Sequence, residues 1–269
     1  MDLHVVSVSG GKDSTALYLW AIEQFGRTGF RAVFADTGSE HPATVNYVRN
    51  LSELASGPEV EMVKADFSKQ LAAKEKTPSG VPFLDMLMVK GPPSPKHQFC
   101  TEKLKLAPIR DWLESVRGDA DVFMYVGIRA AESERRAAMP QVQFSEFFDC
   151  EVRRPLLYWS ETQVFGQLNK FGVEPNPLYE AGYTRVGCFP CIYSCKQDLA
   201  RMPDWAWQRL FDWETRSGHR FFPPGKGHQM FNDLKTVREW ATSPTRFDKE
   251  PAEQTDVGSC LVHWSVCGT

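Results

Sequence analysis

The residues with the clearest chemical potential form a short turn near the N-terminus, within the stretch VSVSGGKDSTALYL over residues 6–19. Two adjacent glycines, Gly10 and Gly11, let backbone amides converge on an anion, and the helix expected after them adds its positive N-terminal end. Lys12 supplies a point charge for a phosphate oxygen. The spacing fits neither the Walker A motif nor the Gly-x-Gly-x-x-Gly dinucleotide fingerprint. The stretch therefore predicts a phosphate-binding turn of another kind, with an ordinary glycine turn between a strand and a helix as the alternative.

Seven cysteines are the second feature with chemical potential. In a reducing cytosol such thiols are more often metal ligands or reactive groups than disulfide partners, and their odd number argues against a closed disulfide framework. Cys188 and Cys191 offer two sulfurs from one tight turn, a spacing that suits zinc and iron–sulfur clusters alike. Isolated buried thiols are the alternative, which suits Cys150 better than this pair.

Composition narrows the classes of protein that the chain can belong to. It has 269 residues, of which 42% are hydrophobic and 24% are charged, enough for one globular domain with or without a smaller appendage. No apolar stretch approaches the roughly 20 residues that span a bilayer, and the first residues lack the pattern of a secretory signal. A net charge of −3 gives no global attraction to nucleic acid. We therefore expect a cytoplasmic protein without a membrane partner.

The elements that must position these residues follow from hydrophobic periodicity. Short apolar runs alternate with helical patterns through residue 174, which is typical of an α/β fold with a parallel, Rossmann-like sheet and helices on both faces. The expected strands are 4–9, 31–38, 60–64, 121–129 and an edge strand at 152–157, and the expected helices are 14–25, 40–54, 68–74, 102–116 and one within 159–172. The phosphate-binding turn then follows the first strand.

Two regions depart from that alternation. Residues 74–99 are rich in Pro, Gly and Lys, and we expect a long mobile insertion there, of the kind that forms a lid. From residue 175 the cysteines cluster, Pro and Trp increase, and no clear strand follows. We therefore predict an α/β domain over residues 1–174 and a small, mainly helical, cysteine-rich region over residues 175–269.

Five motifs, in chain order, resemble those of a known superfamily. SGGKDS, residues 9–14, resembles the pyrophosphate loop (PP-loop) of the ATP pyrophosphatases, or adenine nucleotide α-hydrolases, which cleave ATP between its α and β phosphates. Four further stretches resemble segments of the phosphoadenosine phosphosulfate reductase-like family within that superfamily. They are FADTGSEHPAT (34–44), FCTEKLKLAPI (99–109), GIRAAESERR (127–136) and EAGYTRVGCFPCIYSC (180–195). The resemblance covers residues 3–200 and is closest to iron–sulfur members such as the ATP pyrophosphatase of DNA phosphorothioation. It implies an enzyme with a HUP-type sheet.

The resemblance implies a nucleotide site in the 1–174 domain. Its nucleotide-binding residues would be Ser9, Gly10, Gly11, Lys12, Asp13, Ser14, Asp36, Thr37 and Gly127, and its catalytic residues would be Lys12, Asp13, Arg129 and Arg135. Lys12 and the loop amides would hold pyrophosphate, and the two arginines would stabilise charge. Asp13 and Asp36 would orient magnesium or the nucleotide. A capped turn at 36–37 and solvated charges at 129 and 135 are the alternatives.

The resemblance also implies the kind of metal centre. Cys100 falls where cluster-containing adenylyl sulfate reductases have a Cys-Cys pair, and Thr101 replaces the second cysteine here. Cys195 can supply the missing ligand, so we expect a [4Fe-4S] cluster, or else Zn²⁺, on Cys100, Cys188, Cys191 and Cys195. Cys260 or Cys267 could instead be the fourth ligand. These two could also join Cys188 and Cys191 and leave Cys100 free as a sulfur carrier.

An intact loop with its lysine implies ATP chemistry, because reductases of adenylyl sulfates bind nucleotides without a β,γ-pyrophosphate and have a degraded loop. We expect an ATP pyrophosphatase that uses ATP and Mg²⁺ to adenylate a substrate for sulfur transfer. Its sulfur donor would be a cysteine desulfurase or a thioredoxin-like protein. A phosphoadenylyl or adenylyl sulfate reductase that releases sulfite is the first alternative, and a nucleotide-sensing module without catalysis is the second.

The sulfur acceptor has little sequence signal, and family analogy alone suggests a nucleic acid, either tRNA or DNA. Residues 203–228 interleave basic and aromatic side chains, which can neutralise and stack on a single strand. The aromatic members are Trp205, Trp207, Trp213, Phe221 and Phe222. The alternative is that these rings pack a helix against the core while their basic neighbours face water.

Overall fold

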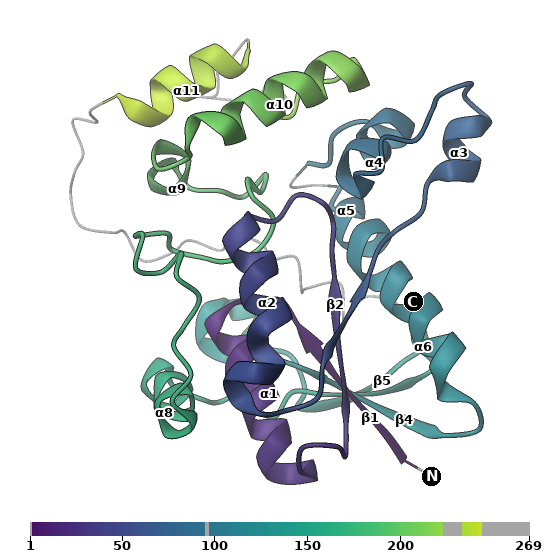
Figure 1. Cartoon of the computed structure of the whole chain (residues 1–269), viewed down its shortest axis with the longest axis vertical. Coiled ribbons are helices and arrows are strands. Elements are labelled where there is room, and N and C mark those ends of the chain that lie inside the picture. Colours follow the sequence, from purple (N-terminus) through teal and green to yellow (C-terminus); the bar gives the residue numbers. More distant parts are fainter. Residues whose placement is uncertain (1, 95–96, 223–232, 244–269) are drawn as a thin grey trace.

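The computed structural model describes residues 2–94, 97–222 and 233–243 of the chain. The centre of this described part is a six-stranded sheet with the order β3-β2-β1-β4-β6-β5 (Figure 1). The strands are β1 (Asp2–Val8), β2 (Arg31–Ala35), β3 (Val60–Val63), β4 (Asp121–Val126), β5 (Val142–Ser145) and β6 (Cys150–Arg153). Neighbouring strands are parallel except β5 and β6, which are antiparallel. The expected α/β fold with a Rossmann-like sheet is therefore confirmed, with one antiparallel strand at its edge.

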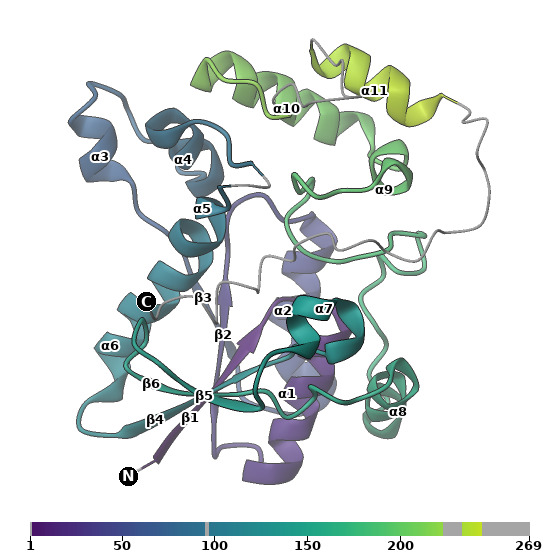
Figure 2. The ribbon, with the colours of Figure 1, turned by 180° about the vertical axis from the view of Figure 1, so that it is seen from behind.

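Helices cover both faces of this sheet, as expected. They are α1 (Lys12–Phe25), α2 (Pro42–Ala55), α3 (Ser68–Ala72), α4 (Pro82–Lys90), α5 (Phe99–Thr101), the π-helix η1 (Glu102–Leu106), α6 (Ala107–Arg117), the 3₁₀ helix η2 (Ala130–Glu132), α7 (Glu134–Ala137), α8 (Glu161–Phe171), α9 (Lys196–Ala200), α10 (Asp204–Ser217) and α11 (Leu234–Thr242). Residues of α1, α2 and α8 share one hydrophobic cluster with the sheet, and residues of η1 and α6 share another. Figures 1 and 2 accordingly show α6 on one side of the sheet and α1 and α8 on the other. No described helix combines the length with the apolar composition that a membrane span requires.

Helix α8 begins where its sequence pattern predicts. Ser160 Oγ accepts a hydrogen bond from Gln163 N at 3.2 Å, and Gln163 Oε1 accepts one from Ser160 N at 2.8 Å. These two bonds form the expected capping box. The helix ends at Gly172 in the left-handed conformation, with a φ of 64°, which is a common helix stop. The cap places Glu161 in the first turn of α8, where its Oε1 lies 3.5 Å from Nζ of Lys12, the first residue of α1.

The edge of the sheet differs from the sequence expectation. The edge strand predicted at 152–157 is wrong, because β6 starts at Cys150 and lies inside the sheet between β4 and β5. β5 is the edge strand at this end of the sheet, and it was not predicted. Its alternate residues Val142 and Phe144 are 51% and 61% exposed. The strand therefore turns its apolar side chains outward, which is the reverse of the pattern that identifies a half-buried strand.

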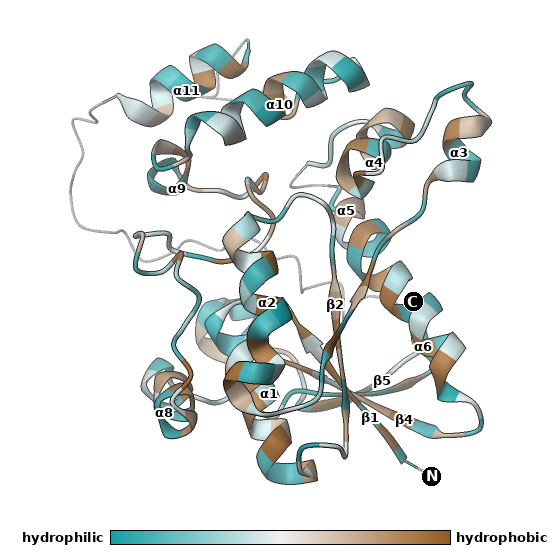
Figure 3. Cartoon of the chain, in the orientation of Figure 1, coloured by the Kyte–Doolittle hydropathy of each residue, from teal (hydrophilic) through white to brown (hydrophobic). Residues whose placement is uncertain are grey.

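The mobile insertion predicted at 74–99 is wrong for the centre of that segment. The centre forms α4, whose apolar side chains are almost fully buried and which Figure 3 shows as largely hydrophobic. The ring of Phe83 stacks on that of Trp213 in α10, with their centroids 5.3 Å apart. The residues that suggested a loop instead bound the helix, since Pro82 is its first residue and Gly91 follows its last. Both positions are usual for these residue types.

The regular elements that the structure describes after residue 174 are helices, as expected, whereas residues 175–195 form turns. Figure 1 shows α9, α10 and α11 together at the end of the molecule away from the N-terminus. One hydrophobic cluster joins residues of these helices to residues of α3, α4 and η1. Trp207, Trp213 and Phe221 are buried in this cluster, so the packing alternative holds for these three rings. The domain boundary near residue 174 stays a prediction.

Candidate functional site

The segment of residues 9–14, called the phosphate turn below, connects β1 to α1 at the carboxyl end of a central strand. Ser14 Oγ accepts a hydrogen bond from Ser9 N at 3.0 Å and donates one to Gly11 O at 3.0 Å. Gly10 has a φ of 79°, and a Cβ on it would lie 2.7 Å from Thr44 Cγ2, so no side chain fits there. The turn presents backbone amides at the N-terminus of a 14-residue helix, a position that favours anions.

Three of the predicted catalytic residues meet at the phosphate turn. Lys12 Nζ lies 3.2 Å from Asp13 Oδ2 and 3.5 Å from Glu161 Oε1 of α8. Arg129 Nε donates a hydrogen bond to Asp13 Oδ1. The side chains of Lys12 and Asp13 are each 14% exposed and that of Arg129 is 7% exposed, so salt screens these charges less than it would at the surface. Asp13 thereby holds two cations next to the amides of the turn.

Gly127 lets β4 approach the phosphate turn closely enough for this arrangement. A Cβ on Gly127 would lie 2.9 Å from the carbonyl oxygen of Asp13, closer than real Cβ contacts allow. The backbone N of Arg129, two residues further on, donates to Glu132 Oε2 at 3.0 Å, which anchors the start of η2. The close approach expected at Gly127 is thus present, while its contact with a nucleotide stays a prediction.

Arg135, the fourth predicted catalytic residue, is exposed on α7. Within the described part of the chain, no hydrogen bond or ion pair joins it to the phosphate turn. Its neighbour Arg136 is buried instead and pairs with Glu132. The sequence motif with its two adjacent arginines could not distinguish the buried one from the exposed one, and the role of Arg135 stays a prediction.

A second polar turn follows β2, the neighbouring strand. Asp36 Oδ1 accepts a hydrogen bond from Gly38 N at 2.9 Å, and Asp36 Oδ2 lies 3.0 Å from Lys64 Nζ. This is the capped turn that the sequence offered as an alternative. Thr37 is fully buried and donates from its N and its Oγ1 to the carboxylate of Glu40, at 3.0 and 2.7 Å. Burial raises the pKa of Glu40.

An open pocket of about 430 Å³ lies beside this second turn. It is lined by Asp36, Gly38, Glu40, Pro42, Val45, Asn46 and Arg49. Its volume lies in the range of small-molecule sites, and its lining combines apolar atoms with a few polar groups, as such sites usually do. Asp36 therefore both caps its turn and lines a pocket, whereas Thr37 is not among the lining residues.

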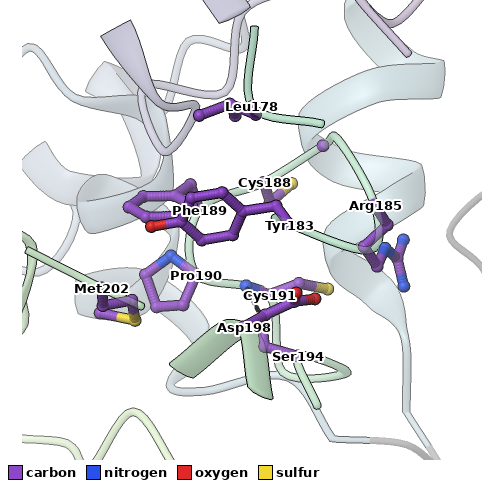
Figure 4. A pocket seen from close by; sticks show the side chains of 11 residues that line it. Leu178, Tyr183, Arg185, Cys188, Phe189, Pro190, Cys191, Ser194, Asp198 and Met202 are labelled. Carbon is purple, nitrogen blue, oxygen red and sulfur yellow. Dashed lines mark hydrogen bonds between the residues drawn. The ribbon is translucent and has the colours of Figure 1, made fainter. Parts of the chain in front are cut away.

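Residues 187–195, called the cysteine loop below, place two of the predicted metal ligands at one small pocket. Figure 4 shows Cys188 and Cys191 there. Cys188 Sγ lies 4.0 Å from Thr37 Oγ1, and the backbone of Cys188 forms a β-bridge with Glu40. The cysteine loop therefore contacts the turn after β2, so that a thiol lies beside one of the two turns of the candidate nucleotide site.

The other two predicted ligands have different surroundings. Cys100 is buried in the hydrophobic cluster that includes α4, whereas Cys195 is exposed and has Thr184 Oγ1 at 3.9 Å from its Sγ. Across residues 2–94, 97–222 and 233–243, no group of three or more Cys, His, Asp or Glu side chains lies close enough to hold a metal ion. The metal centre on Cys100, Cys188, Cys191 and Cys195 therefore stays a prediction. Cys260 and Cys267 lie outside the described residues, so a centre that includes them stays a prediction.

Two residues that sequence reasoning missed contact the phosphate turn from far along the chain. Asn176 Nδ2 donates to Gly10 O at 3.0 Å, and the Tyr179 hydroxyl accepts a hydrogen bond from Lys12 N at 3.1 Å. These partners are 166 and 167 positions apart, so no local pattern links them. The sequence feature that could have indicated them is their position just before the motif at 180–195.

Arg209 of α10 is one of the basic side chains interleaved with the aromatic rings of residues 203–228, and instead of facing water it joins the turn after β2 to the cysteine loop. Its guanidinium donates to Ser39 O at 3.3 Å and to Phe189 O. It lies 5.1 Å from the ring centres of both Trp205 and Trp213, and burial lowers its pKa to about 10. Two of the rings predicted to stack on nucleic acid thus flank this arginine.

Known proteins resemble the chain over this whole site. The family model described as phosphoadenosine phosphosulfate reductase domain matches residues 3–194. An uncharacterized 37.8 kDa protein in the gpa 5' region of Escherichia phage 186 is 36% identical and is aligned over 91% of this chain and 87% of its own length. The nin region protein ORF290 of Escherichia phage lambda is 32% identical and is aligned over 99% of this chain and 96% of its own length. An adenosine 5'-phosphosulfate reductase of Streptomyces coelicolor is 28% identical and is aligned over 72% of this chain and 85% of its own length.

Proposed function

The chain belongs to the phosphoadenosine phosphosulfate reductase domain family, and from this we propose that it is an adenine nucleotide α-hydrolase that releases pyrophosphate from ATP. One observation carries the choice of ATP. Lys12 stands at the first position of α1, beside the amides of a glycine turn, and Asp13 holds it together with Arg129. The helix N-terminus and the two cations, whose charges Asp13 and Glu161 balance, form a site for phosphate oxygens.

The second turn supports a place for the rest of the nucleotide. The pocket beside Asp36 adjoins the carboxyl end of β2, and ligands of open parallel sheets bind outside the carboxyl ends of the strands. Asp13 is already paired with Lys12 and Arg129, whereas Asp36 pairs with Lys64, whose side chain is 54% exposed. Asp36 is therefore the carboxylate that would hold the Mg²⁺ bound with ATP, and the ion would neutralise charge on the leaving pyrophosphate.

The proposed reaction begins with the attack of a substrate oxygen on the α-phosphorus. The new phosphorus–oxygen bond forms as the bond to the α,β-bridging oxygen breaks, and the pyrophosphate keeps that electron pair. Lys12 and the turn amides stabilise the charge that develops there, with Arg129 next to them. The terminal sulfur of a persulfide on a cysteine desulfurase or a thioredoxin-like donor then displaces AMP from the adenylated substrate. A dithiol cleaves the resulting S–S bond, which leaves the sulfur on the substrate while the dithiol becomes a disulfide. The acceptor that fits this scheme is a tRNA or DNA base.

A reductase of adenylyl sulfates is the second candidate, and the position of Cys188 favours it. Its thiol lies 4.0 Å from Thr37 Oγ1 at the turn after β2, and the relative from Streptomyces coelicolor is called an adenosine 5'-phosphosulfate reductase. In that reaction a thiolate attacks the sulfate sulfur, AMP leaves, and a cysteine S-sulfonate forms. A second thiol, such as that of a thioredoxin-like protein, then attacks the cysteine sulfur and releases sulfite, leaving a disulfide.

The metal centre is a separate proposal, since neither scheme needs it. Cys188 and Cys191 would contribute two ligands to a [4Fe-4S] cluster or to Zn²⁺, with the remaining ligands from other cysteines. Iron, zinc and acid-labile sulfide content of anaerobically purified protein tests this. A broad absorption band at roughly 400 nm supports the cluster.

Product analysis tests the proposed function. The protein is incubated with Mg²⁺, ATP labelled in its α-phosphate, bulk tRNA or DNA as acceptor, and sulfide as the sulfur nucleophile, and AMP and pyrophosphate are the expected products. Release of ADP and orthophosphate contradicts the proposal. Sulfite formed from adenylyl sulfate in the presence of a dithiol, without ATP cleavage, supports the reductase instead. Tight ATP binding without any turnover supports a nucleotide-sensing module.

A further inference from the structure

A short segment from the C-terminal region lies against the phosphate turn and is held there rigidly. Asn176 is fully buried, and its Nδ2 donates to Gly10 O at 3.0 Å and to Thr44 Oγ1 at 3.3 Å. Its Oδ1 accepts a hydrogen bond from Leu178 N at 3.1 Å, and its backbone O accepts one from Tyr179 N at 3.0 Å. The amide of Asn176 thus fixes both the turn of the segment and its contact with the glycine of the phosphate turn.

This anchoring sets Tyr179 at the N-terminus of α1. The Tyr179 hydroxyl accepts the hydrogen bond of Lys12 N at 3.1 Å, and Lys12 Nζ lies 5.9 Å from the centre of the ring. A Cβ on Gly11 would lie 3.4 Å from the hydroxyl oxygen. The phenol oxygen therefore lies among the groups that would contact a bound phosphate, and it covers the amide of the first residue of the helix.

The hydroxyl proton is the important part of this arrangement. A tyrosine hydroxyl accepts with its oxygen and donates with its proton. The oxygen is engaged by Lys12 N, and among the described residues no acceptor for the proton of Tyr179 is present. Burial raises the pKa of Tyr179, so the proton stays on the oxygen at neutral pH. The hydroxyl therefore covers the amide of Lys12 but can itself donate a hydrogen bond to a ligand in its place.

We propose that Tyr179 is a further phosphate-binding residue, whose hydroxyl accepts the amide of Lys12 and donates its proton to an oxygen of the pyrophosphate part of the nucleotide. This inference rests on the proposed binding of pyrophosphate at the phosphate turn. It adds a donor from the C-terminal region to a site otherwise built from residues of the first strand and helix. It also makes pyrophosphate binding depend on the segment that leads into the cysteine loop.

The variant Tyr179→Phe tests this by removing only the hydroxyl. Its affinity for inorganic pyrophosphate and for ATP, measured by titration calorimetry, should fall roughly tenfold, as expected when a hydrogen bond to a charged group is lost. Its affinity for AMP, which lacks the pyrophosphate, should change little. The matched control is Tyr183→Phe, which lies in the same segment but donates to Arg201 O at 2.7 Å, away from the phosphate turn. It should bind pyrophosphate as the wild type does.

The outcomes separate the two proposals. If the wild type binds pyrophosphate and Tyr179→Phe binds it equally well, the role of Tyr179 is contradicted while the proposed function stands. If the wild type binds neither pyrophosphate nor ATP, both are contradicted. An equal loss for ATP and AMP contradicts the assignment to the pyrophosphate part. Tyr179→His retains a ring and an N–H donor, and recovery of part of the pyrophosphate affinity relative to Tyr179→Phe supports a donor role over a packing role.

Discussion

The phosphate turn and the cysteine loop are the two segments whose residue types have chemical potential, and they are built differently. In the phosphate turn the binding groups are consecutive amides and the adjacent Lys12, and the hydrogen bonds of Ser14 to residues three and five positions away fix them. In the cysteine loop Cys188 is half-buried, Cys191 is buried and Cys195 is exposed. An anion site made from backbone is complete once strand, turn and helix form. A thiolate site needs side chains from separate segments to converge, and the loop alone does not supply them.

Removal of the lysine should have the largest effect, and it tests the phosphate-turn side of this comparison. Lys12→Met should lower kcat/KM for pyrophosphate release from ATP by roughly 100-fold or more, because a preorganised charge that stabilises the leaving group is lost. Lys170→Met is the control, since Lys170 is 65% exposed and pairs with Glu23 far from the turn. Comparable rates for Lys12→Met and the control would mean that pyrophosphate leaves from another place.

A substitution at Gly10 tests whether the shape of the phosphate turn is as strictly determined as its contacts indicate. Gly10→Ala meets both a positive φ and a Cβ position 2.7 Å from Thr44 Cγ2, whereas Gly80→Ala has nearly the same φ of 77° and open space around the Cβ. We expect urea unfolding to show a loss of about 1 kcal/mol for Gly80→Ala and about 2 to 3 kcal/mol for Gly10→Ala. Equal losses would show that Thr44 moves aside without a penalty.

A pair of cysteine variants tests the other side of the comparison. Cys188→Ser should leave pyrophosphate release from ATP intact, but if the reductase scheme holds it should lower sulfite formation roughly 100-fold or more, because the attacking thiolate is lost. Cys195→Ser should have little effect, because Cys195 is exposed and contacts Thr184 rather than the turn after β2. If both variants lose activity together with bound iron or zinc, the two thiols share a metal centre and the cysteine loop is a convergent site after all.

The same contrast explains what the sequence reveals. The phosphate turn, the approach of Gly127 and the capping box at Ser160 depend on residues near one another in sequence or on glycine at a defined position, so their patterns are readable. The alternation of apolar runs likewise predicts a parallel sheet with helices on both faces, because that pattern follows from which side of each element is buried.

The features that the sequence does not reveal depend on distant partners. Tyr179 reaches Lys12 across 167 positions, and α4 is buried because the C-terminal helices cover it. No pattern within residues 74–99 indicates that cover, so the Pro and Gly residues around α4 resemble those of a loop. The choice of Arg136 over Arg135 as the buried arginine depends on the orientation of a four-residue helix, which tertiary packing decides.

Glu40 joins the turn after β2 to the cysteine loop, and its titration should have the smallest of these effects. Its carboxylate accepts two hydrogen bonds from Thr37, its backbone pairs with Cys188, and burial raises its pKa above the ordinary 4.5. A buried acid with a raised pKa is harder to ionise in the folded state, so the free energy of unfolding should fall as the pH rises from about 4.5 through the folded-state pKa.

Glu40→Gln keeps an acceptor for Thr37 and removes this titration. We therefore expect urea unfolding between pH 5 and pH 8 to show a decline for the wild type that exceeds that of Glu40→Gln by about 1 kcal/mol. Parallel pH curves for the two proteins would mean that Lys105, the nearby cation that lowers the pKa of Glu40, offsets the burial. The junction between the turn after β2 and the cysteine loop would then be insensitive to pH.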